Sequence, residues 1–161
     1  MKKFLPVSAL ILTACSAMAE SKEETNEFYE SKGGTFQVQA IDTKTFEAFP
    51  AWAKIYYTTD GSVNVGVKYY VPDDVCTSFE DEVSRANSFL VNGVKIRGTT
   101  QCTDVGEIML YASSFKGRDY IKRQFSKLNS VNMTIDGISL RFSALGYNWF
   151  AKQKASQHDG L

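Results

Sequence analysis

The feature that most constrains the fold of this chain is the dipeptide Asp136-Gly137, which lies between two alternating apolar runs. Asp-Gly favours a two-residue type I′ turn, because both central residues take positive φ and the twist of the turn then matches the flanking strands. In this register six apolar residues share one face of the hairpin: Val131, Met133, Ile135, Ile138, Leu140 and Phe142. A slip of one residue would turn that face to water, so the sequence predicts a β-hairpin of fixed register.

Two further turn dipeptides predict hairpins of the same kind, Asp60-Gly61 and Asn92-Gly93. In the first of these, the valines of 63–71 alternate with other residues and therefore share one face of a strand. We expect Trp52 and Tyr56, on the partner strand, to pack on the same face.

The remaining local patterns add strands and short helices. Alternating apolar residues predict strands at 35–41 and 107–113. The segment 78–87 fits a short helix, because Ser78 can serve as N-cap with Asp81 in the capping-box position. The aromatic-rich run that ends at Ala151 predicts a C-terminal helical segment.

A longer helix is predicted between the 107–113 strand and the Asp136-Gly137 hairpin. Ile121, Phe125 and Leu128 have the i, i+4, i+7 spacing of one buried helical face, and Asp119 is the expected N-cap. Five basic residues accompany this face: Lys116, Arg118, Lys122, Arg123 and Lys127. We interpret these basic residues as the solvent-exposed face of the helix. The alternative is that they bind a phosphate or an anionic lipid.

The N-terminus has the pattern of an export signal over residues 1–19. A basic start precedes an apolar run at 4–14, which is too short to span a bilayer as an anchor. Two cleavage patterns follow. The sequence that ends at Cys15 resembles a bacterial lipobox, in which the cysteine is acylated, whereas Ala17-Met18-Ala19 would release a soluble periplasmic protein.

Composition divides the rest of the chain into three parts. Residues 20–34 are polar and acidic, which indicates a leader or tether. Residues 35–155 are long enough for one β-rich globular domain with its own core. A polar tail follows at 156–161.

The cysteines predict one disulfide. Cys15 is either acylated or removed with the signal, so Cys76 and Cys102 remain as a pair in an oxidising compartment. The bond would close a loop of about 26 residues and contribute roughly 3 kcal/mol of stability in the chain-entropy model.

The sequence predicts no catalytic residue, no metal ligand and no cofactor. The single histidine, His158, lies in the polar tail, which leaves no partner for a serine or cysteine nucleophile and no multi-histidine metal site. No phosphate-binding glycine motif is present, and the net charge of +0 gives no reason to expect a nucleic-acid partner. The sequence therefore indicates a protein that is not an enzyme.

Aromatic residues, 13% of the chain, offer candidates for a binding surface. In each of the pairs Tyr56-Tyr57 and Tyr69-Tyr70, one ring faces each side of a sheet, and the outward ring could belong to a binding patch. We interpret Trp149 and Phe150 as packing residues.

From about Cys76 to Ala151 the chain resembles the invasion-associated locus B family of bacterial envelope proteins. The resemblance rests on the order of a cysteine, a helix and two strands, followed by Phe142-Ser143-Ala144-Leu145-Gly146-Tyr147-Asn148-Trp149-Phe150. Tyr147 stands where the family has phenylalanine, and Phe150 where it has a small residue. The resemblance implies an exported β-sandwich-like domain linked to host-cell invasion, with no enzymatic activity.

These observations predict a mainly β, antiparallel, sandwich-like single domain with one inserted helix and a C-terminal helical segment. The expected function is that of an exported envelope protein that binds another protein, with the membrane contacted only through a lipid on Cys15. Two alternatives stay open. One is a periplasmic inhibitor or immunity protein against an envelope-acting toxin or enzyme, and the other is a carrier of an apolar ligand.

Overall fold

The computed structural model describes residues 27–58, 61–77 and 88–158 of the 161-residue chain. The predicted export signal with Cys15, the predicted helix at 78–87 and part of the Asp60-Gly61 turn lie outside the described residues. Neither of the two helices in the described part is long and apolar enough to cross a membrane.

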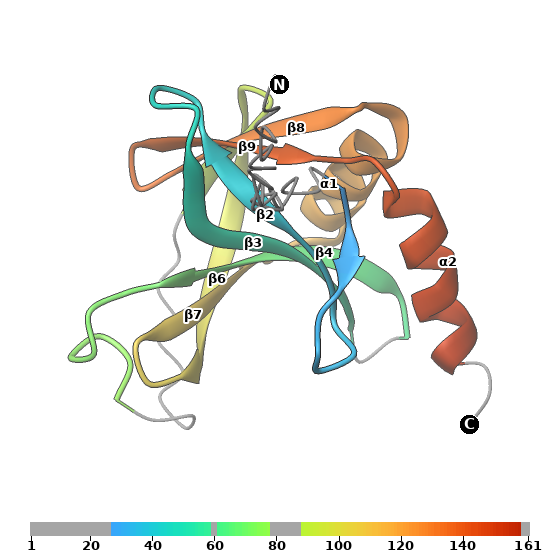
Figure 1. The fold of residues 1–161 in the computed structure, drawn as a ribbon, viewed down its shortest axis with the longest axis horizontal. Helices are drawn as coiled ribbons and strands as arrows, with labels where there is room; N and C mark the ends of the chain where they lie inside the picture. The colour runs from blue at the N-terminus through green and yellow to red at the C-terminus, as the bar shows by residue number, and fades with distance from the viewer. Residues whose placement is uncertain (1–26, 59–60, 78–87, 159–161) are drawn as a thin grey trace, which may run out of the picture.

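Within the described residues the chain forms nine strands and two helices (Figure 1). The strands are β1 (Tyr29–Glu30), β2 (Phe36–Asp42), β3 (Ala48–Tyr57), β4 (Val63–Tyr70), β5 (Ser88–Val91), β6 (Val94–Asp104), β7 (Glu107–Ala112), β8 (Ser130–Ile135) and β9 (Ile138–Ser143). The helices are α1 (Phe115–Lys127) and α2 (Tyr147–His158). The prediction of a mainly β domain with an inserted helix and a C-terminal helix is confirmed.

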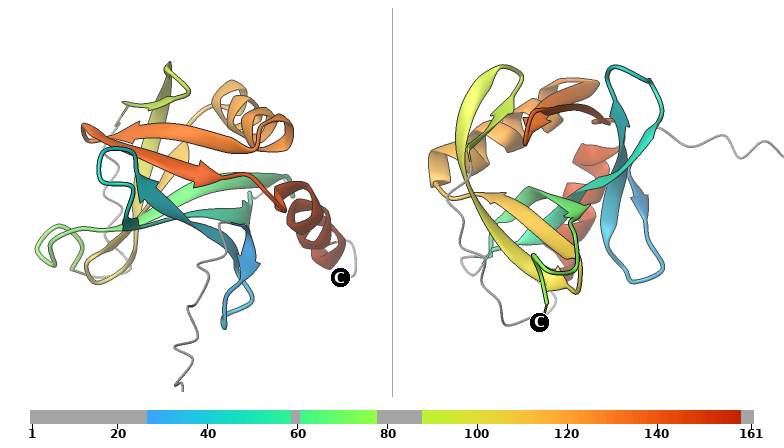
Figure 2. Two further views of the ribbon diagram at one scale, coloured as in Figure 1. Left: turned by 45° about the horizontal axis from the view of Figure 1, so that its top comes forward. Right: turned by 90° about the vertical axis from the view of Figure 1, so that its left-hand side faces the viewer.

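The strands form a closed barrel, so the predicted sandwich is wrong (Figure 2). Eight strands pair antiparallel in the order β2-β3-β4-β7-β6-β5-β8-β9, and β9 returns to β2. The closing pairs join Ala40 to Phe142 and Asp42 to Leu140. Register shifts in β2, after Gln39, and in β6, after Cys102, bend the sheet, and such bulges favour closure over two stacked layers.

The Asp136-Gly137 hairpin has the predicted register. Val131 lies opposite Phe142, Met133 opposite Leu140, and Ile135 opposite Ile138. Asp136 and Gly137 have φ of 49° and 81°, as a type I′ turn requires. Five of these six apolar side chains are buried, and Ile138, beside the turn, is exposed.

The predicted placement of Trp52 and Tyr56 is wrong. Trp52 lies opposite Lys68 and Tyr56 opposite Asn64, so both aromatic side chains are on the outer surface of the barrel. Ala53 and Ile55 are the buried residues of β3 that lie opposite the interior valines Val67 and Val65 of β4. Ala51, which is also buried, lies opposite Tyr69.

The barrel interior is filled by side chains from all eight strands and by one face of α1. Ile121 and Phe125 of α1 are buried as predicted, but Leu128 ends the helix and is exposed. The N-cap is Ser114, whose Oγ accepts a hydrogen bond from the backbone N–H of Gly117 at 3.1 Å, so the prediction of Asp119 is wrong.

Gly117 lies in the first turn of α1, where the helix approaches the barrel wall. A Cβ at this position would lie 3.1 Å from Ile96 Cγ2 and 3.2 Å from the Ala112 Cβ. The first turn of α1 therefore lies close to the barrel wall, and any side chain at position 117 would require its neighbours to shift.

The described end of the 20–34 segment belongs to the fold. Phe28 is buried, and its ring lies 5.9 Å from that of Phe125 and 5.7 Å from that of Tyr147. Residues 29 and 30 form strand β1 beside β2. At the other end of the chain, α2 lies against α1, β3 and β4 and continues into the predicted tail as far as His158.

Candidate functional site

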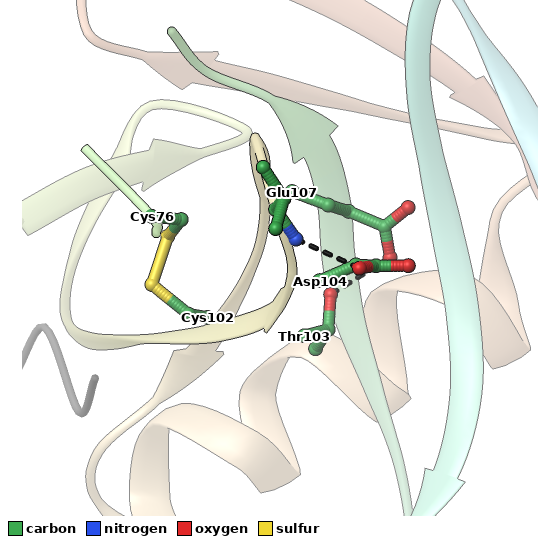
Figure 3. Close-up of a disulfide and its surroundings, with 6 residues drawn as sticks. Cys76, Cys102, Thr103, Asp104 and Glu107 are labelled. Carbon is green, nitrogen blue, oxygen red and sulfur yellow. Dashed lines mark hydrogen bonds between the residues drawn. A yellow bond between two sulfur atoms is a disulfide. The ribbon is translucent and has the colours of Figure 1, made fainter. Parts of the chain in front are cut away.

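The end of the barrel away from α1 carries a disulfide. Cys76 and Cys102 are joined, with their Sγ atoms 2.02 Å apart, and both side chains are buried beside Ile108 (Figure 3). The bond ties the segment after β4 to the end of β6. Next to it, Thr103 Oγ1 donates a hydrogen bond to Glu107 Oε1 at 2.8 Å.

Among residues 27–58, 61–77 and 88–158, no group of three or more histidine, cysteine, aspartate or glutamate side chains is placed to hold a metal ion. The described surface carries three candidate binding features, which lie on different parts of the barrel.

The outer wall of β3, β4 and β7 carries an aromatic and charged layer. Lys68 Nζ lies 2.5 Å from Glu107 Oε2. It also lies 5.8 Å from the ring centroid of Trp52 and 5.7 Å from that of Tyr70. Lys68 is thus already paired with a carboxylate and two aromatic rings. Burial, together with the nearby Lys68 charge, lowers the pKa of Lys54.

The first candidate site continues this wall. We call it the tyrosine–arginine groove. It has a volume of about 370 Å³ and is lined by Tyr56, Tyr57, Thr58, Thr99, Gln101, Tyr111, Ala112, Ser113 and Arg118. The rings of Tyr56 and Tyr111 meet edge to face, with centroids 4.9 Å apart. Burial raises the pKa of both tyrosines, so both hydroxyls stay protonated and can donate hydrogen bonds.

Two residues of β4 hold this groove in shape. A Cβ at Gly66 would lie 3.2 Å from Tyr111 Cδ1 and 3.1 Å from the Leu110 carbonyl oxygen, so glycine lets the Tyr111 ring rest on the strand. Asn64 is buried, and its Nδ2 donates to Ser62 Oγ at 2.9 Å and to Thr58 Oγ1 at 3.2 Å. This network fixes the end of β3, where Tyr56 lies.

The second candidate is a cavity of about 240 Å³ at the end of the barrel opposite α1. It is lined by Phe49, Pro50, Tyr69, Tyr70, Val71, Pro72, Ile135, Asp136, Ile138 and Leu140. The Tyr69 hydroxyl donates to Asp136 Oδ2 at 3.4 Å across it. Burial first, and then the Asp136 carboxylate, raises the pKa of Tyr69.

The third candidate is an exposed apolar surface, which we call the Trp149 patch. It consists of Leu128, Leu145 and Trp149, whose exposed fractions are 43%, 43% and 59%. All three border one depression of about 230 Å³, whose lining also includes polar residues such as Ser126 and Asn148 and exposes more polar than apolar surface. Trp149 lies in the first turn of α2, which Figure 1 shows at the edge of the barrel.

The structure separates residues that the sequence grouped together. Phe150 packs against the Phe36 ring at a centroid distance of 4.9 Å. Trp149 packs on the Phe150 ring but is otherwise exposed, so its interpretation as a packing residue describes only one edge of its side chain. Of the five basic residues associated with α1, Arg118 is the one that lines the groove. Tyr56 is the outward ring of its pair, and no pattern in the sequence predicts that Tyr111 lies beside it.

Comparisons of the chain with family models, with curated proteins and with solved structures give no match.

Proposed function

We propose that this chain is an exported protein of the bacterial cell envelope that acts without catalysis by binding another protein through the Trp149 patch. The observation that carries the proposal is the exposure of Trp149 beside Leu128 and Leu145 on a folded surface. Tryptophan is among the residues that contribute most to binding energy when it fills a pocket of a partner. Protein interfaces combine buried apolar side chains with hydrogen-bonding groups, and the patch offers both kinds beside one depression.

The patch is held rigidly, which lowers the entropic cost of binding. The Trp149 ring packs on the Phe150 ring at a centroid distance of 4.5 Å, and Phe150 packs on Phe36 of β2. Asn148 Nδ2 donates to the Ser126 carbonyl oxygen at 3.0 Å, which ties the start of α2 to the end of α1. The partner that fits this surface presents an apolar pocket surrounded by hydrogen-bonding groups.

The two alternative functions use other features. An inhibitor or immunity protein would also act by protein binding, and the same patch would serve it. A carrier of apolar ligands would use the cavity at the barrel end, whose volume of about 240 Å³ is below the roughly 300–1,000 Å³ of typical small-molecule sites. Protein binding therefore ranks first.

Replacing Trp149 with alanine is expected to reduce partner binding by at least about tenfold, because removal of a central interface tryptophan typically costs 2 kcal/mol or more. The measurement is quantitative recovery of proteins bound from envelope extracts. Phe115→Ala is the matched control, since Phe115 is also an exposed aromatic residue, at 67%, but begins α1 away from the patch. Equal recovery by the wild-type protein and both variants would refute the proposed surface.

We also propose that Cys15 is acylated and anchors the protein to a membrane, on the support of the lipobox pattern. Wild-type protein is then expected to incorporate a fatty-acid analogue in growing cells, and Cys15→Ser is expected to lose the label. Absence of label on the wild-type protein would instead favour cleavage after Ala19 and a soluble periplasmic form.

A further inference from the structure

We propose that the tyrosine–arginine groove is a second binding site and that it takes a sugar bearing a carboxylate or phosphate group. The site goes beyond the proposed protein binding, because it lies at the other end of α1 from the Trp149 patch. Arg118 and Leu128 are ten positions apart, which corresponds to about 15 Å along a helix axis.

The charge of the groove indicates an anionic ligand. In the part of the chain that the structure describes, the ion pairs are Lys68 with Glu107 and Arg123 with Asp119, and Arg118 has no carboxylate partner. Asp119, which follows Arg118, is thus already engaged by another arginine. A guanidinium group binds a carboxylate or phosphate through two parallel hydrogen bonds. An anionic group on the ligand would therefore form with Arg118 the ion pair that no carboxylate of the described residues forms.

The other lining groups indicate a sugar attached to that anion. The half-buried rings of Tyr56 and Tyr111 offer apolar surface, and their hydroxyls add polar groups at the ring edges. Thr99, Gln101 and Ser113 add hydroxyl and amide groups on β6 and at the end of β7. A sugar presents the same combination, with apolar C–H faces and hydroxyls that both donate and accept.

The groove is formed before any ligand arrives. Tyr111 rests on the Gly66 backbone, and Asn64 holds the turn that follows Tyr56. Preformed sites bind with a smaller loss of conformational freedom. The volume of about 370 Å³ lies within the range of small-molecule sites and suits one or two sugar rings.

The test is a titration of the purified protein, followed by the backbone amide NMR signals of Thr99, Gln101 and Ser113. The probes are glucuronate and glucose 6-phosphate, with glucose and inorganic phosphate as matched controls. We expect saturable shifts with both acidic sugars at millimolar concentrations, and at least about tenfold weaker binding of glucose, because it lacks the charge-assisted hydrogen bonds. Inorganic phosphate is also expected to bind at least about tenfold more weakly than glucose 6-phosphate, because it makes no ring contacts.

Arg118→Gln is expected to weaken binding of both acidic sugars by about tenfold or more. Lys122→Gln removes one positive charge from the same helix outside the groove and should change binding by less than about twofold. The proposal is overturned if neither acidic sugar shifts these signals, or if Arg118→Gln binds as the wild-type protein does. It is also overturned if inorganic phosphate binds as tightly as glucose 6-phosphate, since the groove would then be an anion site alone.

Discussion

Replacing Leu140 with aspartate is expected to unfold the barrel. The Leu140 side chain is 2% exposed and lies opposite Met133 in the hairpin and opposite Asp42 at the pair that closes the barrel. The substitution removes a buried aliphatic side chain, which costs about 2–5 kcal/mol, and places an unpaired carboxylate in the core at a further cost of several kcal/mol. Since domains of this size are stable by about 5–15 kcal/mol, little or no folded protein should remain.

The neighbouring substitution Ser139→Asp is the control, because it introduces the same side chain one position away. Ser139 faces outward and is partly exposed, and its carbonyl oxygen keeps its hydrogen bonds from the Thr43 N–H and Oγ1, each at 3.0 Å. We expect a loss of no more than about 1 kcal/mol. Circular dichroism and urea unfolding measure both variants. Equal damage from the two would mean that the hairpin register is wrong.

The hairpins were predictable because their information is local. Asp136 and Asn92 both have positive φ, which few residue types adopt without strain, and a glycine follows each of them. Once the turn type is fixed, it determines which residues face each other, and the alternating apolar residues determine which side is buried. Val91 opposite Val94 and Met133 opposite Leu140 follow from this rule.

The closure of the sheet was not predictable, because it depends on residues far apart in the chain. The pair Ala40–Phe142 joins strands separated by about a hundred positions. An alternating strand looks the same in a sandwich and in a barrel, since both have one buried face. The bulges in β2 and β6 that accompany closure leave no turn dipeptide in the sequence.

The candidate sites were predictable only in part, for two physical reasons. The side of the sheet on which Tyr56 lies depends on the length of the connection between β3 and β4. The pair Tyr57–Val63 leaves five residues in this connection, and the turn dipeptide alone does not determine that number. A pairing moved by one residue would place Tyr56 inside, which is the side predicted from the sequence. The exposure of Trp149 was not predicted. Apolar periodicity predicts which residues are buried, but it does not show where a neighbouring helix or strand ends and leaves a side chain uncovered.

The second large effect is expected from loss of the disulfide. The disulfide joins residues that are 26 positions apart and so closes a loop in the unfolded chain. In the double variant Cys76→Ala/Cys102→Ala this loop is open. The expected loss is roughly 3 kcal/mol in the chain-entropy model. For a domain of this size the melting temperature should then fall by roughly 10 °C. Alanine keeps the buried site beside Ile108 apolar, so the main change is the loss of the covalent bond.

Two measurements separate the bond from the packing around it. Intact-mass spectrometry without reductant should show the wild-type protein lighter by two hydrogens than the reduced form, and finding two free thiols would contradict the disulfide. A reductant should lower the melting temperature of the wild-type protein to that of the double variant and should leave the variant unchanged. If the variant is less stable than the reduced wild-type protein, the difference measures the side-chain packing that Cys76 and Cys102 provide against Ile108, Tyr69 and Val71.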